Sequence, residues 1–393
     1  MKRLDIAIAG CGVAGLACAA LLRRVGANVV IFDKLETPRP LGSGIILQPV
    51  GLRVLDDIGA GDAIRALGAP IKRLFGRAEP HGGVVLDVRY AARGKDAPCG
   101  LGIHRGALFQ VLHDAALLAG AEIENSREVL GIRDRRLVFA DGVSASFDLI
   151  IDALGMRSPL SGAPPSPLPF GALWASLDAP VDVGFDGAAL EQRYRQARKM
   201  VGVMPIGRLK GETREQVAFF WSLKHVDRAA WRAAPIEAWK DEVLALWPQT
   251  SPLLGQIHSH DDLVFATYAH RTLRDPVSRE CVHVGDSWHC ASPQLGQGAN
   301  MALLDALALA RALETQSNLD AALGEYARLR SFHIGLYQLA SWMFTPAYQS
   351  DNAVFAIVRD WIMSPLSRTP PAPHVLAALV AGEIGSPLKT IGA

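Results

Sequence analysis

The chain has 393 residues, half of them hydrophobic, and its 40 basic and 39 acidic side chains leave a net charge of +1. This length predicts one large domain or two, and the balanced charge argues against nucleic acid or an anionic membrane as a partner. Five cysteines without a Cys-x-x-Cys pair predict no disulfide framework and fit a reducing compartment. Because no apolar stretch could span a bilayer and residues 1–5 lead directly into a strand, we expect a cytoplasmic protein without a signal peptide or integral membrane segment.

The first predicted elements form a βαβ unit. Residues 6–9 are an apolar run that stops at Gly10, as a strand buried on both faces would. Residues 16–25 have the apolar character of a helix that returns across this strand, and residues 28–33 read as a second strand. The two strands are therefore expected to be parallel neighbours.

A glycine motif lies inside this unit. Gly10, Gly12 and Gly15 fall where the strand turns tightly, where the backbone approaches a pyrophosphate and where the helix presses on the sheet. Negative phosphate charge would meet the unpaired N–H groups at the helix start. Asp33, at the end of the second strand, can accept hydrogen bonds from both ribose hydroxyls of an adenosine. Together these features predict dinucleotide binding.

The chain then leaves the first sheet and returns to it. Residues 36–49 are rich in Pro and Gly and are predicted to be a loop near the ligand, followed by helical spacing over 51–58 and 61–67. Alternating polarity over 84–89 predicts a strand with one exposed face. Arg105 stands just before the next predicted helix, where the macrodipole disfavours a cation, which indicates an anionic partner.

Short strands and a linker follow. The next strands are expected at residues 121–129, 137–139 and 143–147, as a meander that turns at Asp141-Gly142. Residues 149–152 read as another buried parallel strand. A proline-rich segment, residues 159–169, then predicts a boundary between two parts of the fold.

The next hundred residues have a different pattern. Strands are predicted at 172–177, 200–206, 217–223 and 263–268. An amphipathic helix is predicted over 236–247, so we expect an antiparallel sheet with helices on one face. Polar aromatic side chains in this part are candidates for substrate contact, namely Tyr194, Trp221, His225 and Tyr268.

A second glycine motif follows the strand predicted over 281–284. Asp286 lies just past the end of that strand, where ligands bind in open α/β sheets, so its carboxylate can accept a hydroxyl hydrogen bond. Gly296 and Gly298 free the backbone before a long helix, whose first N–H groups can face negative charge. The histidines near this motif match no familiar metal site, and we expect no metal.

These two motifs carry a family resemblance. The first glycine motif with Asp33, then Arg105, then the stretch 285–300 resemble, in order and spacing, the class A FAD-dependent monooxygenases, the aromatic hydroxylases of the p-hydroxybenzoate and salicylate hydroxylase type. The resemblance covers residues 1 to 335 and is weakest over 172–263. It implies an α/β fold: a Rossmann-like FAD-binding domain with a mostly parallel sheet, an antiparallel-sheet substrate domain and C-terminal helices.

The resemblance also implies the cofactor site. It places Asp33 on the adenosine ribose, Arg105 along the FAD, Asp286 on the ribityl chain and the amides near Gly298 at the flavin pyrimidine edge. The residues that it assigns to FAD are Gly10, Gly12, Val13, Ala14, Gly15, Asp33, Lys34, Arg39, Gly44, Arg105, Asp286, Pro293, Gly296, Gly298, Ala299 and Asn300.

The implied reaction is a hydroxylation. In the family NADH or NADPH reduces the flavin, O2 forms a C4a-hydroperoxide, and its distal oxygen passes to a small aromatic or polyketide-like substrate. Two alternatives stay open: an FAD oxidoreductase of the same fold without oxygen insertion, such as a reductase, oxidase or halogenase, and a non-redox FAD-binding protein. The second is motivated by Leu154, which stands where the family usually has an aspartate. Asp152 lies two residues earlier on the same face of the strand, from where it could take over part of that role.

The resemblance divides the chain into three parts. We expect the FAD-binding domain at residues 1–75, 100–165 and 265–335, the substrate-binding domain at 76–99 and 166–264, and a C-terminal helical segment at 336–393. That last segment is apolar enough either to cover the substrate domain or to form a homodimer interface.

Overall fold

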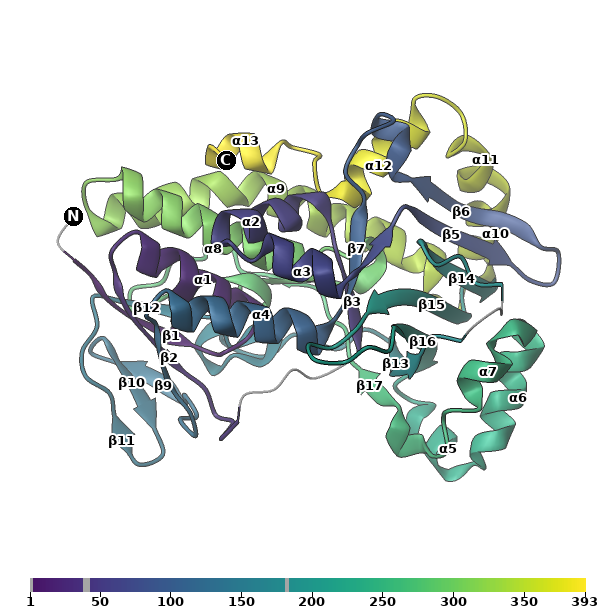
Figure 1. Ribbon diagram of the computed structural model, residues 1–393, viewed down its shortest axis with the longest axis horizontal. Coiled ribbons are helices and arrows are strands. Elements are labelled where there is room, and N and C mark those ends of the chain that lie inside the picture. The colour runs from purple at the N-terminus through teal and green to yellow at the C-terminus, as the bar shows by residue number, and fades with distance from the viewer. Residues whose placement is uncertain (1–2, 38–42, 181–183) are drawn as a thin grey trace.

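The computed structural model describes residues 3–37, 43–180 and 184–393. Its first sheet, sheet A, contains the predicted βαβ unit (Figure 1). All five strands are parallel and run in the order β19-β12-β1-β2-β8, so the first strand of the chain lies in the centre, where its apolar side chains are buried on both faces. The strands are β1 (Asp5–Ala9), β2 (Asn28–Phe32), β8 (Glu122–Glu124), β12 (Leu149–Asp152) and β19 (Val282–His283).

Helices cover one face of sheet A. Helix α1 packs against both α4 and α8, and α8 packs against the long helix α9. These helices are α1 (Val13–Arg24), α4 (Arg105–Leu118), α8 (Gly298–Thr315) and α9 (Leu319–Tyr348). Arg105, expected just before its helix, is the first residue of α4. The largest apolar core of the molecule lies between these helices and the sheet.

A small antiparallel sheet covers the opposite face of sheet A. Its strands are β9 (Gly131–Arg133), β10 (Arg136–Phe139) and β11 (Gly142–Val143). Leu137 and Phe139 pack with Phe32 and Ile150 of sheet A in a second apolar cluster. The predicted turn before Gly142 is confirmed. The strand expected over 121–129 as the first of the meander is limited to β8, which pairs parallel with β2 in sheet A, and β9 takes its place in the meander.

Sheet C forms the other half of the molecule, at the right of Figure 1. Its order is β17-β13-β16-β15-β14-β5-β6. The strands are β5 (Arg73–Ala78), β6 (Gly83–Arg89), β13 (Phe170–Asp178), β14 (Ala189–Arg195), β15 (Lys199–Gly207), β16 (Gln216–Lys224) and β17 (Val264–Ala266). The predicted antiparallel sheet is confirmed, with one parallel pair, β14 and β5.

Helices cover both faces of sheet C rather than the one face that was expected. On the outer face, Trp221 of β16 packs with Trp239 and Trp247 beneath the short helices α5 (Arg228–Ala233), α6 (Ile236–Leu246) and α7 (Ser251–Leu254). On the inner face, Val380 and Ala381 of α12 (Ala372–Ala381) join the cluster formed by β5, β6, β15 and β16. The tail of the chain supplies this second cover.

Smaller elements connect the two halves. The segment expected to be a loop over 36–49 contains strand β3, which pairs with β7 in a sheet of order β3-β7-β4. These connecting elements are β3 (Gly44–Leu47), α2 (Pro49–Ile58), α3 (Gly61–Leu67), β4 (Ala69–Ile71) and β7 (Gly100–His104). A short pair, β18 (Arg271–Thr272) and β20 (His289–Cys290), lies near the second glycine motif.

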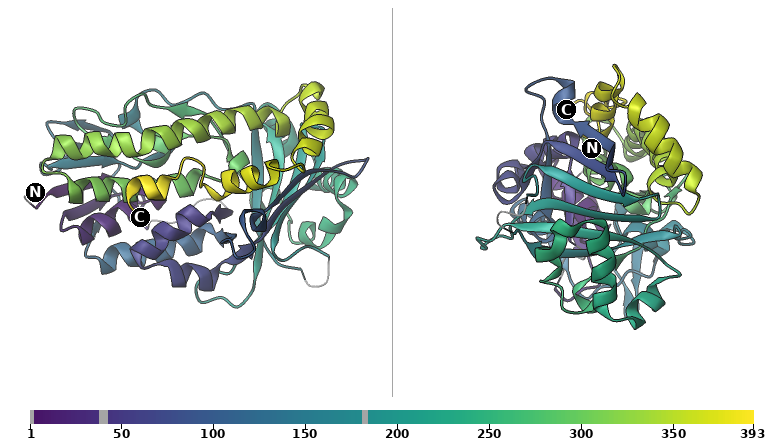
Figure 2. Two further views of the ribbon diagram at one scale, coloured as in Figure 1. Left: turned by 90° about the horizontal axis from the view of Figure 1, so that it is seen from above. Right: turned by 90° about the vertical axis from the view of Figure 1, so that its right-hand side faces the viewer.

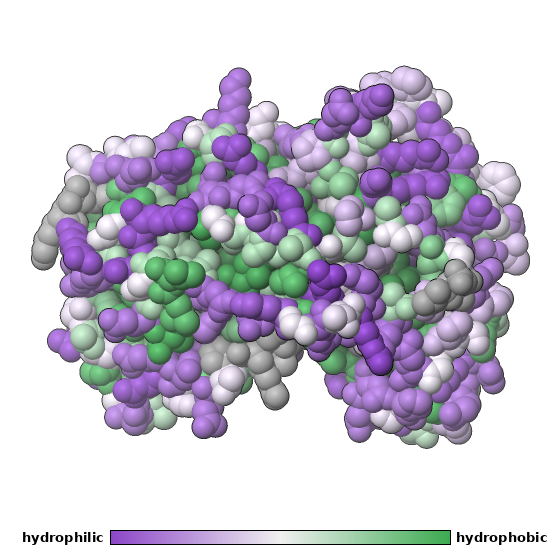
Figure 3. Space-filling view, in the orientation of Figure 1, coloured by the Kyte–Doolittle hydropathy of each residue, from purple (hydrophilic) through white to green (hydrophobic). Residues whose placement is uncertain are grey.

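The C-terminal helices run along the molecule. Figure 2 shows α9 extending from the sheet A half to the end where β5 and β6 lie. It is followed by α10 (Ala353–Val358), a π-helical turn η8 (Arg359–Met363), α11 (Ser364–Leu366), α12 and α13 (Pro387–Ile391). Hydrophilic side chains cover most of the face seen in Figure 3. Among the described residues, no helix has the length and apolar content that a membrane crossing requires.

Candidate active site

The first glycine motif forms a turn in which each glycine has a different role. Gly10 has a φ of +107°, and a Cβ there would lie 2.6 Å from the carbonyl oxygen of Ala153. A Cβ on Gly15 would lie 2.0 Å from the oxygen of Gly10, so helix and strand could not approach as they do. A Cβ on Gly12 would meet nothing within 4 Å. Gly10 and Gly15 are thus required by the fold, whereas Gly12 faces open space beside the start of α1.

That open space fits a phosphate group. Gly12 caps α1 without a side-chain hydrogen bond, so side chains leave the first N–H groups of the helix available. The Asp33 carboxylate supports the turn: its Oδ2 accepts from the Cys11 N–H at 2.8 Å and its Oδ1 from the Leu35 N–H at 2.9 Å. Because a carboxylate has about four acceptor positions, Asp33 keeps capacity for ribose hydroxyls. Lys34 is exposed beside it, and Arg39 lies outside the described residues.

The second motif presents another helix start. Helix α8 begins at Gly298 without a side-chain cap, and a Cβ on Gly298 would also meet nothing within 4 Å. The side chain of Asn300 is fully buried and hydrogen-bonds within the protein. Its Oδ1 accepts from the Gln48 N–H at 2.8 Å, and its Nδ2 donates to the oxygens of Gly296 at 2.9 Å and Ile46 at 3.3 Å. Asn300 therefore fixes the loop after β3 against the loop before α8.

A buried ionic network supports this motif from below. Asp305 and Arg330 are fully buried, with 2.7 Å between Oδ1 and Nε, and Asp305 Oδ2 lies 2.7 Å from His289 Nε2. The same Oδ2 accepts from the Gly285 N–H at 2.8 Å. Burial alone would raise the pKa of Asp305, but the charges of His289 and Arg330 outweigh it and lower that pKa. Burial and the adjacent Arg330 lower the pKa of His333 to about 3, so a neutral ring accepts from the guanidinium at 3.1 Å.

Asp286 is the residue after Gly285, whose N–H belongs to this network. Solvent reaches its side chain through a cavity, but protein encloses it closely enough that burial raises the pKa of the carboxyl. The charges of His289, Arg105 and Arg271 lower the same pKa in part. Burial disfavours the ionised form of Asp286, whereas the cationic neighbours favour it. A carboxyl group in such surroundings is suited to hydrogen-bond with a polar ligand.

The cavity has a volume of about 790 Å³ and spans both halves of the molecule. One end, here called the cofactor end, brings together residues predicted from the sequence. They are Gly44, Arg105, Asp286, Pro293, Gly296, Gly298 and Ala299. The first glycine motif adjoins this end, since a Cβ on Gly285 would lie 3.2 Å from the Cβ of Ala14. The two motifs, far apart in the chain, are therefore neighbours.

Two of the four predicted substrate residues line the cavity. The Tyr268 hydroxyl accepts from Trp174 Nε1 at 2.8 Å, and burial raises its pKa. The Tyr194 hydroxyl donates to Gln192 Oε1 at 2.8 Å. The other two do not line the cavity: Trp221 belongs to the core on the outer face of sheet C, and His225 packs edge-on against the ring of Phe265.

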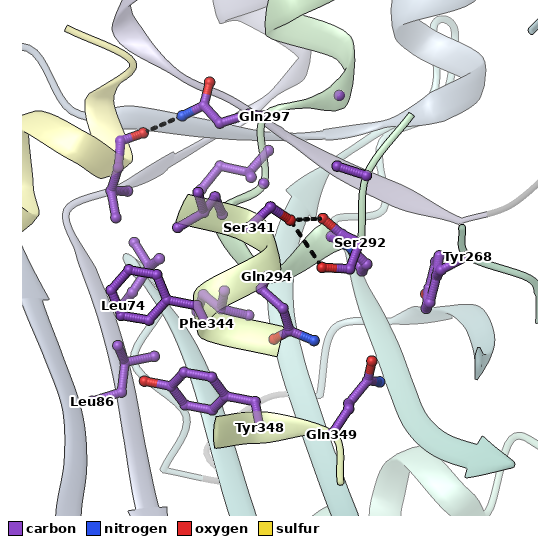
Figure 4. Close-up of a pocket in the computed structure, with 18 of the residues that line it drawn as sticks. Leu74, Leu86, Tyr268, Ser292, Gln294, Gln297, Ser341, Phe344, Tyr348 and Gln349 are labelled. Carbon is purple, nitrogen blue, oxygen red and sulfur yellow. Dashed lines mark hydrogen bonds between the residues drawn. The ribbon is translucent and has the colours of Figure 1, made fainter. Parts of the chain in front are cut away.

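Sequence reasoning missed a polar stripe on α9. Gln338 Nε2 donates to the oxygen of Cys290 at 3.1 Å, and the Ser292 hydroxyl lies 3.0 Å from that of Ser341 and 2.6 Å from that of Thr345. Figure 4 shows Ser341 and Ser292 joined by hydrogen bonds in the wall of the cavity. Gln338, Ser341 and Thr345 recur at helical spacing in the apolar second half of α9, which is the signal that could have identified them.

The structure also answers what Asp152 does beside Leu154. Asp152 is fully buried: its Oδ2 lies 2.8 Å from His283 Nδ1 and accepts from the Ser158 hydroxyl at 2.7 Å, while its Oδ1 accepts from the Leu154 N–H at 3.0 Å. Burial lowers the pKa of His283, but the hydrogen bonds with Asp152 and Cys281 outweigh it and raise that pKa to about 9. Asp152 is therefore committed to the protein interior, and the idea that it takes over the role of the missing family aspartate is wrong.

Comparison with known proteins identifies the family. Residues 3–330 match the FAD binding domain family. The chain is 28% identical over 386 residues to an aurachin C monooxygenase/isomerase from Stigmatella aurantiaca, covering 93% of this chain and 94% of that protein. It is 30% identical over 338 residues to a 6-hydroxynicotinate 3-monooxygenase from Bordetella bronchiseptica, covering 79% and 82%.

Solved structures share the fold. The 2-methyl-3-hydroxypyridine-5-carboxylic acid oxygenase superposes with a TM-score of 0.80 at 21% identity over 99% of this chain and 98% of that one. Klebsiella pneumoniae HpxO, complexed with FAD and uric acid, superposes with a TM-score of 0.76 at 18% identity over 96% and 97%. With its two glycine turns meeting at one cavity, the chain belongs to the FAD-binding family of class A flavin-dependent monooxygenases.

Proposed function

We propose that the protein hydroxylates an aromatic substrate with NAD(P)H and O2. The overall reaction takes two electrons as hydride from NAD(P)H and one proton, places one oxygen atom of O2 on the ring and releases the other as water. The observation that carries the proposal is the cavity of about 790 Å³, in which the start of α8 and Asp286 meet an aromatic-lined chamber. The relatives named as monooxygenases support it.

We propose that FAD lies across the two glycine motifs. Its phosphates would meet the start of α1 at Gly12, its adenosine ribose Asp33, and its ribityl chain Asp286. When bound, FAD supplies the redox chemistry: it accepts hydride from NAD(P)H and reacts with O2. The N–H groups at the start of α8 favour negative charge beside Gly298 and Ala299 and so stabilise the reduced state of the ring.

The chain's own residues would position the substrate and exclude water. Trp174 and Tyr268 form a hydrogen-bonded aromatic pair in the cavity wall, and Phe220 stacks on Trp174 with ring centroids 4.6 Å apart. Such a wall suits a planar ring. Buried apolar side chains on the inner face of sheet C keep bulk water out of the same space.

Steady-state measurements on the FAD-loaded protein test the proposal. NADH or NADPH consumption is followed with and without a panel of phenols, together with the hydrogen peroxide yield and the hydroxylated product. Substrate-dependent consumption with little peroxide supports hydroxylation. Consumption without oxygen insertion would instead indicate an FAD reductase or oxidase, and a flavin that no nicotinamide reduces would indicate a non-redox FAD-binding protein, the possibility that Leu154 motivates.

A further inference from the structure

The cavity continues well beyond the cofactor end into a second region, here called the apolar arm. The arm is lined by Leu74, Val85, Leu86, Leu190, Met363 and Leu366. These side chains come from β5, β6, β14, η8 and α11, which lie together at the right-hand end of the molecule in Figure 1. Figure 4 shows Phe344 and Tyr348 reaching from α9 toward Leu74 and Leu86. The arm therefore lies between sheet C and the C-terminal helices.

Charged groups in the wall of the arm are already engaged. Asp87 holds Arg73 through two hydrogen bonds, of 2.7 and 2.8 Å. Arg359 is 1% exposed; its Nε lies 2.6 Å from Asp360 Oδ1 and its Nη1 donates to the oxygen of Ala347 at 3.0 Å, whereas its Nη2 has no hydrogen-bond partner among the described residues. Among the described residues, the other charged side chains of the cavity wall are Arg105 and Asp286, both at the cofactor end. Because Asp87 and Asp360 already balance the charges of Arg73 and Arg359, an ionised substrate group in the arm would be desolvated without a free counter-charge.

The arm reaches the protein surface at its far end. Leu366 and Val375 both line the cavity, yet they are 60% and 47% exposed. An apolar side chain that belongs both to a cavity wall and to the surface marks an opening with an apolar rim. A substituent longer than the arm could therefore extend outward between α11 and α12 without displacing a polar group.

From this arrangement we propose that the substrate is an aromatic ring that carries an uncharged hydrocarbon chain, with the ring at the cofactor end and the chain in the apolar arm. The inference rests on the proposed hydroxylation and specifies its substrate class. Each methylene buried in such an arm is worth about 0.8 kcal/mol, which corresponds to roughly a fourfold gain in affinity.

The test compares three probes that share one head group: 4-ethylphenol, 4-octylphenol and 8-(4-hydroxyphenyl)octanoic acid. Their dissociation constants are measured on the FAD-loaded protein without NAD(P)H, from the change in flavin absorbance. We expect 4-octylphenol to bind more than about 100-fold tighter than 4-ethylphenol. We expect the acid to bind more weakly than 4-octylphenol, because its carboxylate would be desolvated.

A pair of variants locates the effect. Leu366→Asp places a charge at the rim of the arm and should reduce the 4-octylphenol preference over 4-ethylphenol at least about tenfold. Leu118→Asp, at a leucine 88% exposed on α4 and away from the cavity, should leave that preference unchanged.

Equal affinity for the two alkylphenols would overturn the proposal. Tightest binding of the acid would also overturn it and would indicate instead that Arg359 pairs with a substrate carboxylate. Because these constants are measured without turnover, a strong 4-octylphenol preference together with no phenol-dependent NAD(P)H consumption would support the arm and contradict the hydroxylation.

Discussion

The starts of α1 and α8 are built differently although both face the predicted cofactor. Each lacks a side-chain cap and has a glycine with open space around its Cβ position, Gly12 as the cap of α1 and Gly298 as the first residue of α8. The start of α1 is shaped by backbone packing, in which Gly15 touches Gly10 and one partly exposed acid, Asp33, ties the turn. The start of α8 instead depends on buried polar side chains, above all Asn300.

The difference shows what makes each helix start rigid. A backbone turn is defined by residues that lack side chains, so it tolerates no added atom at the packed glycines. A polar network is defined by matched partners, so it tolerates no unpaired group. Substitutions at the two helix starts should therefore fail in different ways.

The largest effect is expected at the ionic network under α8. Asp305→Ala would leave Arg330 buried without its carboxylate and should lower the free energy of unfolding by about 3–5 kcal/mol. Denaturant unfolding of the apoprotein measures this loss. In the Asp305→Ala/Arg330→Met double variant no unpaired guanidinium remains, so it should be more stable than Asp305→Ala; a double variant equally unstable would contradict the network's role.

The ion pair between His283 and Asp152 should make the free energy of unfolding depend on pH. The pKa of His283 is raised from 6.5 to about 9, so its contribution is fully present below pH 6.5 and is lost as pH rises through 9. At about 1.4 kcal/mol per pH unit, the loss is roughly 3 kcal/mol. Unfolding of the wild type and of His283→Gln across this range measures it, and a wild-type profile as flat as that of the variant would refute the assignment.

At the start of α1 the expected effect comes from overpacking. Gly15→Ala would push a methyl group into the Gly10 carbonyl and should cost about 1–3 kcal/mol of stability. Gly324→Ala is the matched control, because Gly324 is exposed in α9 with nothing within 4 Å of its Cβ position, and it should stabilise by about 0.5–1 kcal/mol. Thermal unfolding of both variants checks the pair, and an unchanged Gly15→Ala midpoint would contradict the packing argument.

The smallest effect is expected at Asn300. Asn300→Ala removes the acceptor of the buried Gln48 N–H and should cost about 1–2 kcal/mol. Because the same side chain joins two loops of the cofactor end, the flavin absorbance spectrum of the loaded protein should change as well. If Asn300→Ala lowers the stability but leaves the flavin absorbance spectrum unchanged, Asn300 contributes to folding and not to the cofactor site.

These contrasts explain which parts of the molecule the sequence predicts. The glycine turns, Asp33 and the parallel strands are recognisable because backbone constraints restrict the residue types that can occupy those positions. Strand β14 was not predicted because it buries Glu191 and Gln192, which hides the hydrophobic alternation. Strand β5, too, lay outside the predicted elements.

Residues that line the cavity were harder to predict. Tyr194 and Trp221 are both aromatic residues of central strands, and which face of a strand becomes the cavity wall depends on packing against segments far away in the chain. The tail was assigned either a covering role or a dimer interface, and the structure confirms the cover because α9 and α12 line the cavity. A homodimer remains a prediction.

The most direct test of the account is FAD titration of refolded apoprotein, for the wild type, Gly12→Ala and Asp286→Ala. The two substitutions lie in different glycine motifs, at the proposed pyrophosphate position and the proposed ribityl position, and the Gly12 position has room for a methyl group in the protein itself. The account predicts that the wild type takes up one FAD per chain and turns yellow, whereas both variants fold but bind FAD at least about tenfold more weakly. A wild type that takes up no FAD, or variants that retain it as tightly as the wild type, would contradict the claim that the two glycine motifs hold one FAD between them.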